Sequence, residues 1–496
     1  MEFKLAVWTL LVTFVLSETE EICNKCRCIE GIPMVVDCSR VANMQLPLLE
    51  TDFSTDPSIL YDVRLEGLAL DEVQVLPNAS ISRLSFHDND IEDIDNGAFQ
   101  YLLNLTEIDL SRNLLTFDSL GRDTFLGQFS AEEYLPLQVV VLNLGYNDLH
   151  SLNKDTFDHL PFLEVLQLND NPIKIIDHQT AVAITTLRNL KVLNLSSTGI
   201  SKIPDGLFHA LPKLSALIMS NNKFTTVPQE LENAKALEFL NFNNNPIIYF
   251  QRGDFKGLER LRELNISAMN ELTSIEGEAF GSLRSLEVLR CSFNPNLSFI
   301  ASDAFFGIAN DKNEVKLREI HLRANALEHL SQYMLPWEKL NIVDIEENPW
   351  RCDCHLKWMI NSLVGQINRN TPDLTLSLTC SWPEELKGQS LSTLSGDPSL
   401  SRCKMVFVGR GIDGSGRSSP SLLAVGILGI ALCVFGTSTF LVILLRRNRM
   451  RNSLGRQQQV RYVRTRLDEA FSDRDGQNDY EPELYGDERN KGFPIA

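Results

Sequence analysis

The fold is decided by the stretch LEVLQLNDNPI at residues 163–173. It follows the pattern L-x-x-L-x-L-x-x-N-x-L, with Ile173 in place of the last leucine. The alternation Leu166-x-Leu168 has a period of two, which predicts a short strand whose leucines face inward. Asn171 follows where the chain turns, and its buried amide can satisfy backbone groups that the turn leaves open.

The same pattern recurs along the chain, which indicates a repeat protein. Eleven copies can be counted, mostly 23 to 25 residues apart, with longer gaps of 34 before Asn147 and 31 before Asn325. A degenerate unit around Leu60, Val63 and Leu65 precedes the first copy. The residues at the asparagine position are Asn89, Asn113, Asn147, Asn171, Thr198, Asn222, Asn245, Asn270, Asn294, Asn325 and Asn348.

Such repeats depend on their neighbours, because one unit cannot bury its apolar face alone. A phenylalanine recurs ten residues after the asparagine position and predicts an apolar spine along the back of the stack. Its copies are Phe99, Phe157, Phe208, Phe255 and Phe280. The two ends of the stack would expose this core to water, so each end needs a cap.

Cysteines stand where the caps are needed. One group is Cys23, Cys26, Cys28 and Cys38, and the other is Cys352, Cys354, Cys380 and Cys403. In a secreted chain such even groups indicate disulfides. A C-x2-C pair could instead hold zinc, but an oxidising compartment and the absence of histidine near the first group favour disulfides. Cys291 lies at an apolar repeat position, where a free thiol behaves as a small buried hydrophobe.

Apolar segments near both ends predict a single-pass type I protein of the plasma membrane with an extracellular N-terminus. Residues 1–17 read as a secretory signal. Residues 421–445 are 25 residues without a charge, which is long enough to span a bilayer. The eight arginines in residues 446–466 place the tail in the cytosol. Within that tail, Tyr480 and Tyr485 stand among acidic residues as candidate phosphorylation sites that could dock a cytosolic adaptor.

Repeat, cap spacing and order together resemble the extracellular leucine-rich repeat proteins with cysteine-rich caps and one membrane helix. The resemblance covers about residues 23–403. It implies an α/β solenoid, a curved horseshoe with short parallel strands on its concave face, disulfide caps and one transmembrane helix. It also implies the pairings Cys23–Cys28, Cys26–Cys38, Cys352–Cys380 and Cys354–Cys403.

The expected domains follow from these boundaries. They are the signal peptide (1–17), N-terminal cap (18–58), about 11 to 12 repeats (59–350), C-terminal cap (351–403), stalk (404–420), transmembrane helix (421–445) and cytoplasmic tail (446–496).

Composition and motifs narrow the class of function. A net charge of −19, from 46 basic and 65 acidic residues, disfavours nucleic acid and other anionic polymers as partners. The sequence has no nucleophile elbow, phosphate loop or H-E-x-x-H motif, so we expect neither an enzyme nor a cofactor or metal site.

The leading hypothesis is therefore a cell-surface recognition protein, either an adhesion molecule or a ligand-binding receptor or co-receptor. Its partner would be an extracellular protein or the same protein on another cell. An innate-immune pattern sensor that signals through an associated partner is the alternative. Exposed aromatic and arginine side chains are typical of interface hot spots. The candidates on the strand face and the 120–135 insertion are Tyr146, Phe239, Arg290, Phe293, His321, Arg323, Phe125, Phe129 and Tyr134.

Glycosylation narrows the choice among these candidates. Sequons stand at Asn78, Asn104, Asn194, Asn265 and Asn296. Asn194 and Asn265 lie between two inward residues of a strand, so sugars there would shield the middle of the concave face. We therefore expect partner contacts nearer either end of the face, or on the insertion from Leu120 to Leu135.

Overall fold

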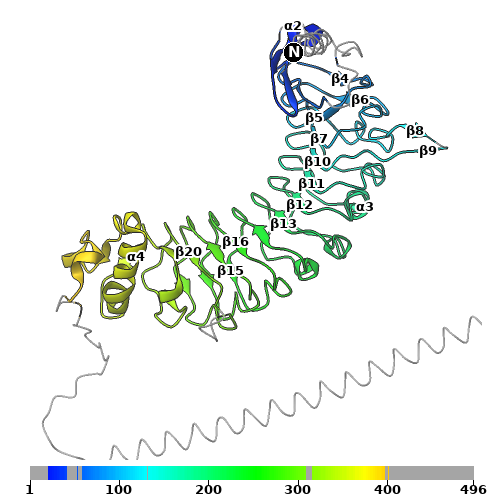
Figure 1. The fold of residues 1–496 in the computed structure, drawn as a ribbon. Coiled ribbons are helices and arrows are strands. Elements are labelled where there is room, and N and C mark those ends of the chain that lie inside the picture. Colours follow the sequence, from blue (N-terminus) through cyan, green and yellow to red (C-terminus); the bar gives the residue numbers. More distant parts are fainter. Residues whose placement is uncertain are drawn as a thin grey trace, which may run out of the picture. The chain divides into compact units, whose positions relative to one another are not determined.

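The computed structural model describes residues 20–41, 53, 59–130, 132–308, 315–396 and 400. These residues stack short strands into one continuous sheet of 14 strands. Figure 1 shows the sheet following the inner side of the bend in the array. In order, its strands are β1 (Arg27–Ile29), β2 (Met34–Asp37), β3 (Tyr61–Arg64), β5 (Ile81–Ser85), β7 (Glu107–Asp109), β10 (Val141–Asn143), β11 (Val165–Gln167), β12 (Val192–Asn194), β13 (Ala216–Ile218), β14 (Phe239–Asn241), β16 (Glu263–Asn265), β18 (Val288–Arg290), β20 (Glu319–His321) and β21 (Ile342–Asp344).

Equivalent repeat positions are direct neighbours across this sheet. Leu166 of β11 pairs with Leu142 of β10 on one side and with Leu193 of β12 on the other. All three leucines are fully buried, whereas the residues that flank them in each strand are half-buried. The alternation of the sequence therefore becomes a column of leucines along the core and a row of more exposed side chains on the opposite face of the strands.

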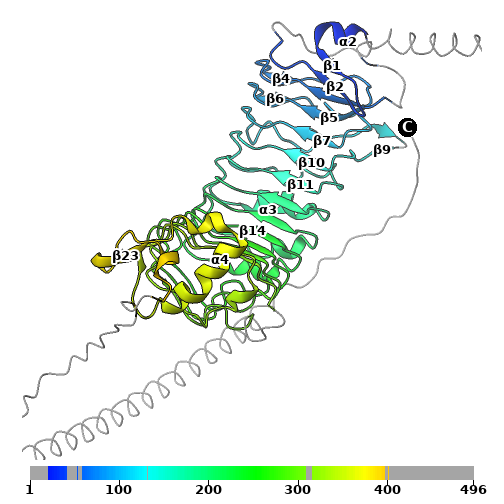
Figure 2. The same cartoon turned by 60° about the vertical axis from the view of Figure 1, so that its left-hand side comes forward.

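The segments that return between these strands contain little α-helix. Among the described residues of the repeats, α3 (His178–Thr186) is the one α-helix, and the other returns use turns, 3-10 helices η2 (Phe208–Ala210), η3 (Gln229–Asn233) and η4 (Trp337–Lys339), and short strands. The short strands are β4 (Glu72–Val73) with β6 (Asp93–Ile94), β8 (Phe129–Ser130) with β9 (Glu133–Tyr134), and β15 (Tyr249–Phe250) with β17 (Ser274–Ile275) and β19 (Phe299–Ile300). Figure 2 shows β4 and β6 on a different side of the stack from β5 and β7. The expected solenoid of parallel strands is present, and the helical part of the expected α/β class is small because each return is short.

One residue of the expected asparagine series was assigned wrongly. In the repeat of β16 the buried position belongs to Met269, which has no exposed surface, and Asn270 is exposed. In each repeat this position lies three residues after the second inward residue, which in this repeat is Ile266, directly after β16. The count from Ile266 therefore ends at Met269. The assignment followed residue type, whereas packing geometry selects by position.

The phenylalanine spine is longer than the sequence indicated. All five expected members are buried, and Phe125 and Phe305 join them. Ring centroids lie 6.0 Å apart for Phe99 and Phe125, and 4.9 Å apart for Phe280 and Phe305. Ring contacts of this kind add to the burial of large side chains and link the backs of successive repeats.

The N-terminal cap contributes strands to the same sheet. Helix α2 (Glu20–Lys25) leads into β1, which pairs antiparallel with β2, and β2 pairs parallel with β3 of the first repeat. Disulfides join Cys23 to Cys28 and Cys26 to Cys38, the pairing that the resemblance implies. The cap therefore extends the sheet by two strands, β1 and β2, and does not cover it with a separate unit.

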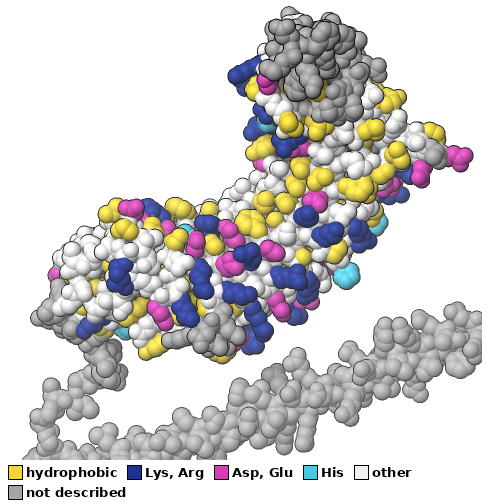
Figure 3. Space-filling view, in the orientation of Figure 1, with side chains coloured by type: hydrophobic (Ala, Val, Ile, Leu, Met, Phe, Trp, Pro, Cys, Tyr) yellow, Lys and Arg dark blue, Asp and Glu magenta, His cyan; other side chains and the backbone are white. Residues whose placement is uncertain are grey.

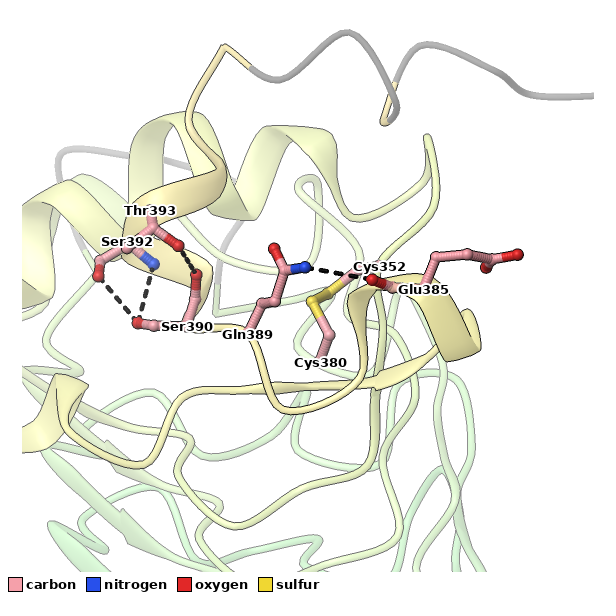
Figure 4. Close-up of a disulfide and its surroundings, with 7 residues drawn as sticks. All are labelled: Cys352, Cys380, Glu385, Gln389, Ser390, Ser392 and Thr393. Carbon is pink, nitrogen blue, oxygen red and sulfur yellow. Dashed lines mark hydrogen bonds between the residues drawn. A yellow bond between two sulfur atoms is a disulfide. The ribbon is translucent and has the colours of Figure 1, made fainter.

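The C-terminal cap is a small helical layer after the last repeat. It contains β22 (Trp350–Arg351), the π-helical turn η5 (Met359–Leu363), α4 (Val364–Asn370), η6 (Pro372–Thr375), β23 (Cys380–Trp382), η7 (Glu384–Leu386) and η8 (Leu391–Leu394). Helix α4 packs against β21. The Cys352–Cys380 disulfide holds β22 beside β23 (Figure 4). Cys354 is also disulfide-bonded, and its expected partner Cys403 lies outside the described residues.

Several expectations concern parts of the chain beyond the described residues. These are the signal peptide (1–17), the stalk (404–420), the membrane segment (421–445) and the tail (446–496) with Tyr480 and Tyr485. In the part of the chain that is described, no helix has the length and apolar character needed to cross a bilayer.

Candidate protein-binding surfaces

Within the insertion of residues 120–135, strands β8 and β9 form an exposed antiparallel hairpin. Its strands β8 and β9 pair Phe129 with Tyr134, and we call residues 129–134 the aromatic hairpin. The side chain of Phe129 is 59% exposed and that of Tyr134 is 45% exposed. Figure 1 shows the hairpin projecting from the side of the array, and Figure 3 shows hydrophobic and acidic side chains over it.

Local contacts hold the aromatic hairpin in one shape. The rings of Phe129 and Tyr134 meet edge to face at 5.1 Å, and the ring of Tyr134 lies 6.2 Å from that of His159 in the next repeat. At its base, a Cβ on Gly127 would come within 2.0 Å of the Leu135 carbonyl oxygen. Only glycine permits this close approach of the two chains. Two large exposed rings are therefore presented on a constrained support.

Phe125 of the same insertion is not available to a partner. Its side chain has no exposed surface and belongs to the phenylalanine spine described above. The expectation that it contacts a partner is wrong, because it occupies the spine position of a repeat rather than the protruding part of the insertion. Leu135, which the sequence analysis did not select, is 41% exposed beside the hairpin.

Four candidates from the strand face gather in two neighbouring repeats. Arg290 of β18 pairs in register with His321 of β20, and the backbone N–H of Phe293 donates to the carbonyl of Arg323 at 2.8 Å. The side chain of Phe293 is 56% exposed, whereas the other three are half-buried. We call these four residues the C-terminal strand-face group.

Charges in the C-terminal strand-face group are already paired within the protein. Arg290 Nε donates to Glu263 at 2.8 Å. Arg323 binds the buried carboxylate of Glu346 at 2.8 Å and also contacts Glu347. Glu346 in turn accepts hydrogen bonds from the backbone and side chain of Ser377 in the cap. Arg323 therefore helps to join the last repeats to the cap.

The remaining two candidates stand apart from each other. Tyr146 is 44% exposed, and the guanidinium of Arg112 lies 4.3 Å from its ring centroid. Phe239 is half-buried in β14, between Ala216 and Glu263 of the adjacent strands. Among the described residues, no contact joins Tyr146 or Phe239 to the aromatic hairpin.

The sequons divide into two groups by position. Asn78, Asn104 and Asn296 are exposed. Asn194 and Asn265 end strands β12 and β16 and are half-buried on the strand face. Phe239 of β14 lies between these two strands in the order of the sheet. Glycans on both asparagines would therefore flank it, and sequon use remains a prediction.

Two family models of leucine-rich repeats match this array. A model described as Leucine rich repeat matches residues 138–192 and 188–247. A second, described as BspA type Leucine rich repeat region (6 copies), matches residues 72–133 and 249–349.

Three curated relatives are similar over part of the chain. Tsukushi of Gallus gallus is 27% identical over 221 residues, which are 40% of this chain and 58% of that protein. Podocan of Mus musculus is 29% identical over 293 residues, 55% of this chain and 45% of that protein. Toll-like receptor 9 of Mus musculus is 27% identical over 246 residues, 47% of this chain and 22% of that protein. The chain thus spans less than two thirds of the length of these relatives. From residue 72 to residue 349, it is a leucine-rich repeat protein.

Proposed function

We propose that this chain is a cell-surface recognition protein that binds a protein partner through its extracellular repeats, with the aromatic hairpin as the principal contact. It acts as an adhesion molecule or as a ligand-binding receptor or co-receptor at the plasma membrane. The observation that carries the proposal is the pair Phe129 and Tyr134, two exposed aromatic rings on a constrained hairpin. Aromatic anchors on rigid supports lose little conformational entropy on binding.

The chemistry around the hairpin indicates the kind of partner surface that fits it. Glu132 and Glu133 are exposed between the two rings along the chain. The complementary surface is an apolar pocket for the rings with basic side chains at its rim, because opposite charges at a rim steer association. This fits a folded protein better than an anionic polymer.

Two observations rank the other candidates lower. The arginines of the C-terminal strand-face group are engaged by Glu263 and Glu346, so a partner would have to displace those pairs. Phe239 lies between the strands that carry Asn194 and Asn265, where glycans would obstruct access. The relative named a Toll-like receptor supports a receptor role, although this chain matches 22% of it.

A cell-mixing assay tests the hairpin directly. Cells displaying the full-length chain are compared with cells displaying Phe129→Ala with Tyr134→Ala, at matched surface amounts. We expect the double variant to lose at least roughly tenfold in partner binding, since aromatic hot spots contribute about 2 kcal/mol or more. The matched control is Tyr249→Ala with Phe299→Ala, a second exposed pair on the short strands β15 and β19. Loss of binding on Phe239→Ala, with the hairpin variant unaffected, would contradict the proposal.

The same assay separates the functional alternatives. Aggregation of expressing cells with one another supports homophilic adhesion, and binding only to other cells supports reception of a separate ligand. Binding of a purified microbial polymer, insensitive to the hairpin variant, would favour the innate-immune pattern sensor instead.

A further inference from the structure

Three potential metal ligands converge where the last repeats meet the C-terminal cap. They are His329, from the return after β20, and Asp353 and His355, from the cap segment after β22. One ligand atom of each lies within 4.8 Å of the others. His329 Nε2 is 3.4 Å from Asp353 Oδ2, and His355 Nδ1 is 3.3 Å from Asp353 Oδ1.

Each histidine nitrogen lies about as far from an oxygen of the Asp353 carboxylate as two ligands of one zinc ion stand from each other. Nitrogen and oxygen ligands at about 2.0–2.2 Å from a tetrahedral Zn²⁺ stand roughly 3.3–3.5 Å from each other. Two histidines and one carboxylate form a three-ligand set that leaves a fourth position open. In the described part of the chain this is the one such cluster of three.

One ligand atom is otherwise unexplained. Nε2 of His329 is buried from solvent and has no hydrogen-bond partner among the described residues, although Asp353 Oδ2 is close. A buried ring nitrogen without a partner costs free energy, and a bound cation would satisfy it.

The cap fixes two of the ligands before any ion binds. The backbone N–H of His355 donates to Asp353 Oδ1 at 2.9 Å. The segment is anchored on both sides of Asp353, because Cys352 is bonded to Cys380 and Cys354 is also disulfide-bonded. A disulfide-bonded Cys354 offers no thiolate, so the ligand set contains nitrogen and oxygen only.

The guanidinium of Arg351 lies near the Asp353 carboxylate, and its position is compatible with a metal ion at this site. Arg351 Nε is 3.3 Å from Asp353 Oδ2, and its guanidinium stacks on the Trp382 ring at 4.0 Å. The stacking on Trp382 and the contact with Asp353 Oδ2 hold the guanidinium where it can orient the carboxylate, as an outer partner of a metal ligand does. Arg351 Nη1 also lies 4.0 Å from Glu328, which offsets part of its charge.

We propose that His329, Asp353 and His355 form a zinc site that joins the repeat array to its C-terminal cap. Zn²⁺ is coordinated by Nε2 of His329, Nδ1 of His355 and the carboxylate of Asp353, with water at the fourth position. His329 and His355 line a hollow of about 930 Å³ together with Asp303, Glu328 and Tyr333, and this hollow gives the fourth ligand room. The ion links His329 of the repeat array to Asp353 and His355 of the cap, and this link does not involve a cysteine.

Calorimetric titration of the purified full-length chain with ZnCl2, without reductant, tests the site. We expect one tight zinc per chain and a higher melting temperature with the ion. His329→Gln with His355→Gln should weaken binding by more than the roughly 10- to 100-fold that loss of an outer partner costs. The matched control His178→Gln with His209→Gln, at exposed histidines elsewhere in the array, should leave the affinity unchanged. Equal zinc affinity in the site variant and the wild type would overturn the proposal.

Two further measurements keep the outcome interpretable. His355→Gln alone changes a side chain that is 78% exposed, so this variant should fold normally and still lose zinc affinity. Co²⁺ in place of zinc should give the absorption bands of a tetrahedral site without a thiolate charge-transfer band. A thiolate band or a six-coordinate spectrum would show binding elsewhere and reject the site.

Discussion

At the scale of single residues, the buried asparagine series works as a relay between repeats. Asn222 Nδ2 donates to the carbonyls of Leu195 and Met219, while its Oδ1 accepts from the N–H of Ile200 in the preceding repeat. Each amide thus satisfies backbone groups of its own turn and of its neighbour.

The relay is interrupted where the position holds another residue. In the repeat that precedes Thr198, the N–H of Ile173 has no asparagine side chain to bind at position 198, and it donates to the carbonyl of Asn171 in its own turn at 2.9 Å. Before Met269, the N–H of Ile247 donates in the same way to the carbonyl of Asn245 at 2.8 Å. A tighter local turn therefore replaces the missing acceptor, and the solenoid tolerates isolated exceptions.

We predict that Asn222→Ala lowers the free energy of unfolding by about 1–3 kcal/mol, because it leaves buried backbone groups without partners. Met269→Leu, at the equivalent position of another repeat, should cost less than about 1.5 kcal/mol because it conserves volume and removes no hydrogen bond. Chemical denaturation of the full-length chain measures both, and equal costs would argue against the relay.

A second residue-scale feature is the free thiol at Cys291. Burial raises the pKa of this thiol to about 12, so it stays protonated at neutral pH. Its side chain has no exposed surface. It therefore serves as a core residue of its repeat, in agreement with its apolar position in the sequence.

At the scale of elements, α3 depends on a single cap. Asp177 precedes the helix, and its Oδ1 accepts from the backbone N–H of Thr180 at 2.8 Å. Its Oδ2 accepts from the hydroxyl of Ser151 in the previous repeat at 2.7 Å. Burial acts to raise the pKa of Asp177, but the hydrogen bonds from Thr180 and Ser151 outweigh it, and the pKa is lowered.

Asp177→Ala should therefore destabilise the protein by about 1 kcal/mol at pH 7, the usual cost of losing a helix cap. Because the folded pKa lies below the unfolded value of about 3.9, the charged cap contributes fully above that pH. Its contribution declines as the pH falls through the folded pKa, so the difference between variant and wild type should shrink in acid. Denaturation at pH 7 and near pH 3 checks this, with exposed Asp205→Ala as control. A difference that grows in acid would contradict the sign.

At the scale of the described solenoid, stability depends on sealing the two ends of the stack. Trp350 at the end of the array has no exposed surface, and its indole N–H donates to the carbonyl of Ile345 at 3.1 Å. The Cys352–Cys380 bond closes a segment with a sequence separation of 28 residues next to it. Loss of this disulfide would loosen the cap, which shields the apolar core of the last repeats from water.

Cys352→Ser with Cys380→Ser should cost about 3–4 kcal/mol, since the unfolded chain regains the entropy of a loop of this size. Thermal unfolding of the full-length chain and hydrogen exchange at β20 and β21 measure the effect. The control is Cys291→Ala, which removes a buried sulfur without breaking a disulfide and should cost about 1 kcal/mol. A larger loss from Cys291→Ala than from the disulfide variant would show that the cap is not limiting.

The repeat pattern alone was enough to predict much of this arrangement. Period-two leucines, a recurring asparagine and a recurring phenylalanine impose the same local geometry in every unit, so strands, turns and spine follow from sequence order. Stacking then needs little long-range information, because each repeat contacts its neighbours. The error at Asn270 arose because the position was assigned by residue type, and the error at Phe125 arose because the longer repeat moves the spine position two residues further from Asn113.

The candidate sites could be predicted only in part. Exposure of Phe129 and Tyr134 was expected from the length of the insertion, but their pairing across a hairpin needed the backbone. Engagement of Arg290 and Arg323 by acidic neighbours depends on which strands lie side by side and on rotamers. The group of His329, Asp353 and His355 unites the array with the cap across a turn of the solenoid, and no local pattern marks it.

The sequence by itself determined the repeat, the positions of the caps and the inward and outward faces of the strands, because these depend on periodicity within each unit. The tertiary structure alone decided which side chains of different units meet. That outcome depends on register between strands, on insertions that change repeat length and on the fold of the cap. Recognition surfaces and metal-ligand sets are built from these contacts between residues of different repeats and of the cap.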